Sequence, residues 1–111
     1  MVLFYNLATL KLAFGYSVGA LPDNVAFSPD GKYALVANEG EPNDDYSIDP
    51  KGSVSIIDLN NWFVGPSEDR IRHVYFTRNG APEGGRIVKP GATFEQDAEP
   101  EYIAVSGDSK H

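Results

Sequence analysis

The chain has 111 residues and no cysteine, which excludes disulfides, thiol catalysis and cysteine-ligated zinc. Its formal net charge of −7 argues against nucleic-acid binding, because phosphate contacts require a basic surface. Hydrophobic residues make up 41% and charged residues 23%, as in an ordinary globular domain. No apolar run is long enough for a membrane-spanning helix, and residues 1–13 lack the basic start and cleavage site of a signal peptide.

Short strand signals separated by turns run along the chain. We expect strands at 2–7, 11–18, 24–28, 33–38, 53–59, 70–78 and 101–106. The 11 glycines and 8 prolines favour turns over long helices. Pro29, Asp30 and Gly31 predict a tight turn, because proline presets φ, aspartate accepts from the backbone ahead and glycine tolerates a positive φ.

An internal repeat carries most of the information about the fold. Residues 22–33 align without gaps to residues 100–111, and five of the twelve positions are identical. The offset of 78 residues exceeds the roughly 40–50 residues of a compact propeller blade, which predicts an insertion between the copies. Ala26 and Ala104 are small, as the crowded centre of a propeller requires. The repeat predicts a β-propeller, with a hairpin of a β-sandwich as the alternative.

The predicted fold class is all-β, built from antiparallel four-stranded β-propeller blades. The chain holds about one full blade and parts of two neighbours. Residues 1–18 are expected to give two strands of one blade, 24–78 a full blade, 79–98 an insertion loop and 99–111 the start of the next blade.

Two stretches resemble known bacterial propellers. Residues 26–38, Ala-Phe-Ser-Pro-Asp-Gly-Lys-Tyr-Ala-Leu-Val-Ala-Asn, resemble the blade signature of surface-layer (YVTN-like) and lactonase-like propellers. Residues 36–46 and 52–58 are similar to a narrower group, the choice-of-anchor propellers, which are related to alkaline-phosphatase-like proteins and a mesenchyme-specific cell-surface glycoprotein. Residues 99–106 match that group's next blade, although 107–109 read Gly-Asp-Ser where the family has Pro-Asp-Gly. The resemblance implies an extracellular, cell-surface or periplasmic location.

An acidic loop over residues 39–49 is the first candidate site, because it holds five carboxylates, an asparagine and no basic residue. Calcium prefers six to eight oxygen ligands in a flexible loop, although the EF-hand spacing is not present. A solvated loop or a partner contact is the alternative. The candidate calcium ligands are Glu39, Glu41, Asn43, Asp44, Asp45 and Asp49.

A second candidate comes from the repeat. Asp23 and Glu101 occupy equivalent positions at the entrance of two predicted innermost strands, where a propeller's channel opens. Carboxylates at this mouth are candidates for cation binding, and bonding of Asp23 to local amides is the alternative. Trp62 and Phe63 predict either a small insertion core or an exposed contact patch.

The sequence supports no catalytic residue. His73 and His111 have no partner at a metal or catalytic spacing, and there is no Gly-x-Ser-x-Gly motif. We therefore expect a non-catalytic binding or scaffold module, with a fragment of a calcium-dependent phosphatase-like hydrolase as the alternative. The expected partners are further copies of the chain, joined through incomplete blades, or the remaining blades of a parent propeller; the ligand is not defined.

Overall fold

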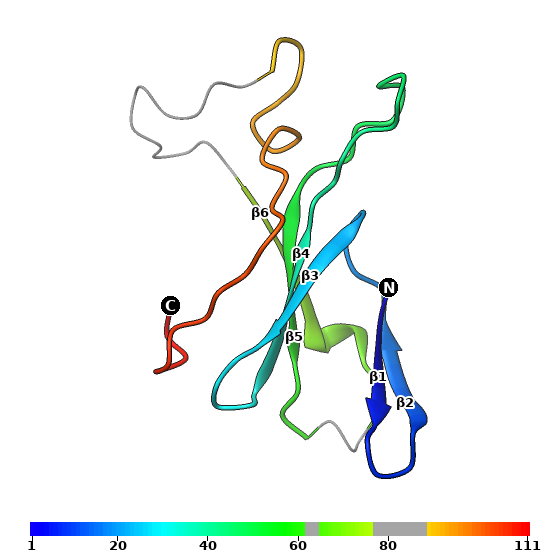
Figure 1. Cartoon of the computed structure of the whole chain (residues 1–111), viewed down its shortest axis with the longest axis vertical. Coiled ribbons are helices and arrows are strands. Elements are labelled where there is room, and N and C mark those ends of the chain that lie inside the picture. The colour runs from blue at the N-terminus through cyan, green and yellow to red at the C-terminus, as the bar shows by residue number, and fades with distance from the viewer. Residues whose placement is uncertain (62–64, 77–88) are drawn as a thin grey trace.

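The computed structural model describes residues 1–61, 65–76 and 89–111 and is all-β within them. Strands β1 (Val2–Asn6) and β2 (Lys11–Tyr16) form an antiparallel hairpin (Figure 1). A second, four-stranded antiparallel sheet holds, in chain order, β3 (Pro22–Phe27), β4 (Tyr33–Asn38), β5 (Ser53–Asp58) and β6 (Ile71–Tyr75). A 3₁₀ turn, η2 (Glu68–Arg70), precedes β6. Among the described residues, no helix is long and apolar enough to span a membrane.

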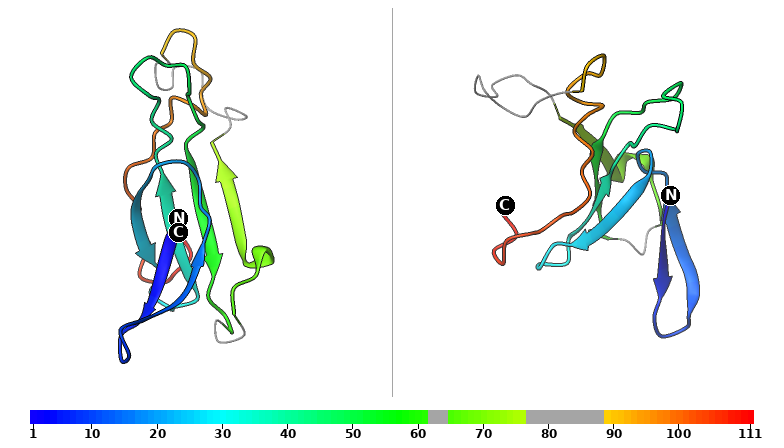
Figure 2. Two further views of the ribbon diagram at one scale, coloured as in Figure 1. Left: turned by 90° about the vertical axis from the view of Figure 1, so that its right-hand side faces the viewer. Right: turned by 45° about the horizontal axis from the view of Figure 1, so that its top comes forward.

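The described residues form three layers, and the four-stranded sheet is the middle one. The β1–β2 hairpin lies against one face, called here the near face, and the C-terminal segment (residues 99–111) crosses beside the opposite, far face (Figures 1 and 2). Side chains alternate between the two faces along each strand. Because β4 and β5 lie in the middle of the sheet, with a neighbouring strand on each side, they are the most buried strands. This burial fits the apolar sequence of residues 33–38.

The core lies between the hairpin and the near face. Ala34 on β4 pairs with Ile57 on β5, and both are fully buried, as is Val36. Tyr16 of β2 completes this core and is buried except for 7% of its surface. These small and branched side chains allow the hairpin's aromatic residues to pack closely above the sheet.

Aromatic rings join the two sheets. Phe4 of β1 stacks on Phe14 of β2, with ring centroids 4.7 Å apart. It also meets Phe27 of β3 edge-on at 6.4 Å. Such pairs stabilise a fold by about 0.5–1.5 kcal/mol beyond the area they bury. The relative position of hairpin and sheet is therefore fixed by side chains, without a disulfide.

Two sequence expectations require correction or restriction. Residues 101–106 form no strand, because a strand needs a hydrogen-bonded neighbour and the described residues provide no ladder for this segment. The last strand of the four-stranded sheet spans Ile71–Tyr75, so residues 70 and 76 of the expected strand at 70–78 are not part of it, and residues 77–78 lie outside the described residues. Trp62, Phe63 and most of the expected insertion at 79–98 lie outside the described residues. The assignment of blades to residue ranges stays a prediction.

Candidate functional site

The turn between β3 and β4 is built on one aspartate. Asp30 Oδ1 accepts the Ser28 hydroxyl at 2.6 Å and the Lys32 N–H at 3.1 Å. The Tyr33 N–H donates to Ser28 Oγ at 3.0 Å. Donation from Ser28 and then from the Lys32 backbone lowers the pKa of Asp30. A tight turn leaves these two donors short of backbone acceptors, and the Asp30 carboxylate accepts their hydrogen bonds instead.

The second copy of the repeat forms the same turn. Asp108 Oδ1 accepts from Ser106 Oγ at 2.6 Å and from the Lys110 N–H at 3.1 Å, and the His111 N–H donates to Ser106 Oγ at 3.0 Å. Ser109, with φ 59°, takes the left-handed position that Gly31 holds with φ 71°. Replacement of Pro-Asp-Gly by Gly-Asp-Ser at 107–109 therefore leaves the hydrogen-bonding pattern intact.

The two turns are in direct contact. The Asp30 N–H donates to Ser109 Oγ at 3.1 Å, although these residues are 79 positions apart. This hydrogen bond brings the turn that follows β3 next to the last residues of the C-terminal segment. We call this pair of contacting turns the turn end of the molecule.

The opposite end carries the acidic loop, whose base joins three distant segments. The Gly40 N–H donates to Ala20 O at 3.2 Å, and the Gly52 N–H donates to Glu95 O at 2.9 Å. A Cβ on Gly52 would lie 2.7 Å from Pro100 Cδ, so a side chain there would displace the C-terminal segment. Gln96 Nε2 adds a 2.9 Å bond to Asp49 O. The base of the loop is consequently fixed by backbone contacts.

At this acidic end, four neighbouring carboxylates act on Glu39. The pKa of Glu39 is raised first by burial, and then by the fields of Glu41, Asp23, Glu101 and Glu99. The acidic loop and the two channel-mouth candidates, which the sequence treats separately, therefore belong to one electrostatic cluster. Alternation and spacing could not reveal this, because the cluster depends on how the C-terminal segment crosses the sheet.

The tip of the acidic loop is closed by its own side chains. Asn43 Oδ1 accepts the Ile48 N–H at 2.9 Å, and Asp45 Oδ1 accepts the Ser47 hydroxyl at 2.6 Å. The Ser47 bonds lower the pKa of Asp45. Lys89 Nζ lies 2.9 Å from the ring centroid of Tyr46, a cation–π contact. Two of the predicted calcium ligands thus hold the loop's own conformation.

No three acidic or histidine side chains within residues 1–61, 65–76 and 89–111 converge in a geometry that could hold a metal ion. The calcium assignment stays a prediction from sequence. It concerns Glu39, Glu41, Asn43, Asp44, Asp45 and Asp49.

A buried polar network on the near face was missed by sequence reasoning. Asn38 Nδ2 donates to Ser55 Oγ at 2.9 Å and to Ser53 Oγ at 3.1 Å, and Ser55 Oγ lies 2.9 Å from His73 Nδ1. The signal was available, because Ser53 and Ser55 alternate in step with the core residue Ile57. Ser55 is 0% exposed, so a substrate cannot reach its hydroxyl. The serine–histidine pair is therefore structural, not nucleophilic.

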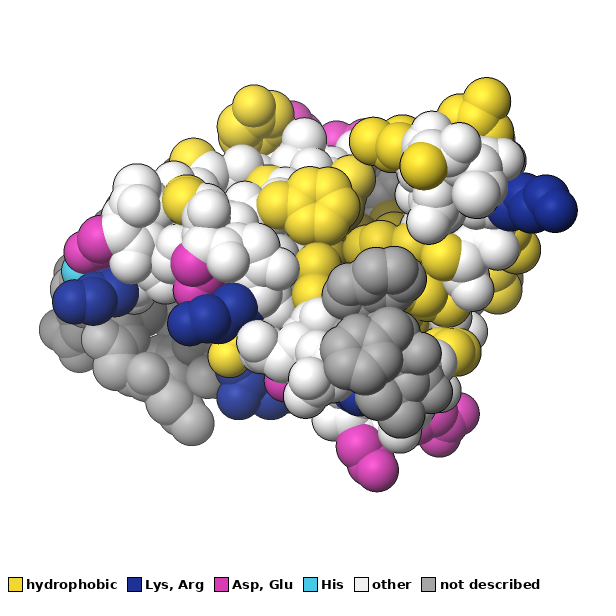
Figure 3. Space-filling model, turned by 90° about the horizontal axis from the view of Figure 1, so that it is seen from below, with side chains coloured by type: hydrophobic (Ala, Val, Ile, Leu, Met, Phe, Trp, Pro, Cys, Tyr) yellow, Lys and Arg dark blue, Asp and Glu magenta, His cyan; other side chains and the backbone are white. Residues whose placement is uncertain are grey.

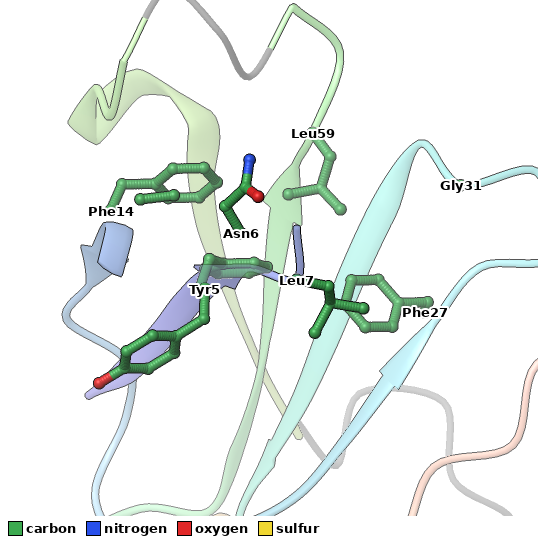
Figure 4. Close-up of a pocket in the computed structure, with 9 residues that line it drawn as sticks. Tyr5, Asn6, Leu7, Phe14, Phe27, Gly31 and Leu59 are labelled. Atoms are coloured by element: carbon green, nitrogen blue, oxygen red, sulfur yellow. The ribbon is translucent and has the colours of Figure 1, made fainter. Parts of the chain in front are cut away.

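An apolar cavity of about 380 Å³ opens between hairpin and sheet (Figure 4). Phe14, Phe27 and Leu59 line it from three different strands or their ends, while the ring of Tyr5 points away. No charged side chain is among the described residues of its wall. The cavity marks where the hairpin leaves part of the near face uncovered.

These features define an all-β module with a repeated turn at one end and a carboxylate cluster at the other. The chain belongs to the choice-of-anchor I domain family, whose profile matches residues 1–111. Domains of this family suggest a protein anchored at the cell surface. Searches of curated proteins and of solved structures found no match.

The Asp30 turn can be tested by carboxyl titration. We expect Asp30 to titrate below the ordinary aspartate value of about 3.9, because its charged form accepts two hydrogen bonds. Since the folded pKa is lowered, this carboxylate stabilises the fold above the unfolded pKa and loses that effect as pH falls through the folded value. Ser28→Ala should return the pKa of Asp30 towards 3.9 in an NMR titration. Ser106→Ala should shift Asp108 alone, and equal shifts of both would contradict the two-turn description.

The acidic end can be tested in the same way. Glu41→Gln should lower the pKa of Glu39, because Glu41 is the largest charge contribution that raises it. Glu101→Gln should act in the same direction, which requires the C-terminal segment to lie beside the loop. Asp58→Asn, at the other end of β5, serves as the control and should leave Glu39 unchanged. A Glu39 pKa insensitive to Glu101→Gln would show that the two segments are apart.

Proposed function

We propose that the chain is a segment of a β-propeller and serves as a non-catalytic binding or scaffold module of a surface-anchored protein. The observation that carries the proposal is the contact between the two repeat turns, Asp30 N–H to Ser109 Oγ at 3.1 Å. In a propeller, successive blades place equivalent turns next to each other around a central axis. The two equivalent turns, which are offset by 78 residues in the sequence, are in contact. This contact supports a propeller over a hairpin of a β-sandwich.

Sheet architecture gives further support. Four antiparallel strands in chain order, β3 to β6, are the composition of one blade. The β1–β2 hairpin packs face to face on this sheet, as the outer strands of a preceding blade would. Ala26 lies on β3, the strand that would be innermost, where a small side chain is needed.

The non-catalytic part of the proposal rests on the chemistry of the described residues. Ser55 and His73 are the pair closest to a nucleophile and base, and burial of Ser55 removes it from substrate. Asn43 and Asp45 are engaged in the loop tip. What remains accessible is surface: a carboxylate cluster at one end and apolar side chains on the faces.

Ser109→Gly tests the adjacency of the turns. Glycine accepts the left-handed backbone at this position, so the turn survives while the hydroxyl is lost. We expect faster hydrogen exchange at the Asp30 amide, which loses its acceptor. The Gly31 amide, bonded to Ser28 O at 2.8 Å, is the internal control and should keep its rate. Unchanged exchange at Asp30 would contradict adjacent turns.

A hydrolysis assay tests the non-catalytic assignment. The chain should hydrolyse a chromogenic phosphate ester no faster than buffer, with or without calcium at about the millimolar level used by extracellular sites. Turnover that requires calcium and is lost in Asp44→Asn would contradict the proposal and favour the hydrolase alternative. Ile48→Glu, a change at an exposed loop position with no carboxylate removed, is the matched control.

A further inference from the structure

Asn38, Ser55 and His73 form a relay in which the direction of each hydrogen bond is fixed. Asn38 Nδ2 lies 3.3 Å from Ser53 O and 3.4 Å from Val36 O. These two carbonyl oxygens can only accept, so the amide is oriented with its nitrogen towards them. The same nitrogen donates to Ser55 Oγ at 2.9 Å, which makes the serine an acceptor towards Asn38.

This polarity determines the tautomer of His73. Ser55 Oγ also accepts from the Gly19 N–H at 3.4 Å, so two donors occupy the lone pairs of the hydroxyl. Its hydrogen is donated to His73 Nδ1, which lies 2.9 Å away. A neutral imidazole that accepts at Nδ1 carries its proton at Nε2. Because Ser55 is fully buried and His73 is exposed, the Nε2–H is presented on the surface side of the ring.

His73 lines a pocket between the hairpin and the last strand of the sheet. The pocket has a volume of about 470 Å³, and its walls come from the end of β2, from the η2 turn and from β6. Both walls therefore belong to this chain. Its polar side chains include those of Ser17, Ser67, Glu68 and His73. No lysine or arginine is among the described residues of its wall.

The polar groups of this pocket are available to a ligand. Within the described residues, no hydrogen bond or ion pair engages the Glu68 carboxylate or His73 Nε2, and Ser67 makes no side-chain capping bond. The carboxylate disfavours an anion, and a protonated Nε2 disfavours a metal ion, which needs a nitrogen lone pair. A ligand hydroxyl both donates and accepts, so a neutral ligand with several hydroxyls satisfies both side chains.

We propose that this pocket binds a saccharide, a neutral ring with several hydroxyl groups and an apolar C–H face. One hydroxyl accepts from the His73 Nε2–H and another donates to Glu68, while the C–H face lies on the apolar wall formed by Pro66 and Ile71. The volume falls within the roughly 300–1,000 Å³ of small-molecule sites. The proposal rests on the proposed role of the chain as a binding module and names the ligand class of that role.

The turn end of the molecule is a poorer match for such a ligand. Apolar side chains gather there (Figure 3), and Leu7 is 87% and Phe27 60% exposed. Both also line the apolar cavity between hairpin and sheet. A hydroxylated ligand in that cavity would lose hydrogen bonds to water without replacing them. The paired donor and acceptor at His73 and Glu68 avoid this cost.

The tautomer is tested first. Imidazole ¹⁵N NMR at about pH 8, where an ordinary histidine is neutral, should show His73 in the Nε2–H form. Ser55→Ala removes the donor to Nδ1 and should give a mixture of both tautomers. An Nδ1–H form in the unmodified chain would overturn the proposal, because the donor would then point at Ser55 and not at the ligand.

Sugar binding is tested by NMR titration with glucose, galactose, mannose and N-acetylglucosamine, each added separately. At least one should give saturable shifts of the amides that line the pocket. His73→Ala and Glu68→Ala should each weaken binding about tenfold, as the loss of one hydrogen bond entails. Their chain neighbours Arg72 and Asp69 do not line the pocket, so Arg72→Ala and Asp69→Ala are the matched controls and should leave the affinity unchanged.

Several outcomes would overturn the proposal. Saturation by none of the four sugars would do so, and so would binding of acetate or phosphate that His73→Ala abolishes, which would indicate an anion site. A control variant that weakens binding as much as the pocket variants would place the sugar elsewhere. Circular dichroism confirms folding, with His73→Phe and Glu68→Leu as substitutes for a variant that unfolds. The Ser109→Gly exchange experiment reads the turn contact separately, so failure of sugar binding leaves the propeller proposal intact.

Discussion

Burial of the near face of β4 and β5 beneath the β1–β2 hairpin is the contact on which the rest of the structure depends. The chain has no disulfide and its described residues have no α-helix, so apolar area between the layers must provide the main stabilisation. Val36 and Ile57 are fully buried there. Because β4 is central, its two ends position everything else: the repeat turn precedes it and the acidic loop follows it.

Polar groups inside this contact restrict how the layers can fit. Asn38 is 0% exposed, and its amide nitrogen holds both Ser53 and Ser55. Gly19 approaches so closely that a Cβ would lie 2.6 Å from Ser53 Oγ. A shift of β4 against β5 would separate Asn38 from the two serines and leave buried polar groups without partners, which costs about 1–3 kcal/mol for each. The network therefore fixes the register that hydrophobic packing alone would leave loose.

Local pattern was sufficient for the strands and for the β3–β4 turn, because alternation and the Ser-x-Asp-x-Lys spacing are properties of neighbouring residues. The repeat aligned Asp108 with Asp30, but the second turn was not predicted, because residues 107–109 read Gly-Asp-Ser in place of Pro-Asp-Gly. Local pattern failed where long-range contacts decide. Residues 101–106 have strand composition but no neighbour to pair with, and the effect of Glu101 on Glu39 exists only because that segment crosses the sheet. The Asn38 network needed the pairing of β4 with β5.

The distribution of chemistry over the surface separates two kinds of exposed side chain. Carboxylates gather at the acidic end, where burial first, and then the fields of Glu41, Asp23 and Glu101, raise the pKa of Glu39. Apolar side chains such as Leu12 and Val74 remain exposed on the hairpin and on the sheet instead. Because β4 and β5 run from the repeat turn to the acidic loop, the burial of these two strands keeps the acidic end and the turn end at opposite ends of the sheet.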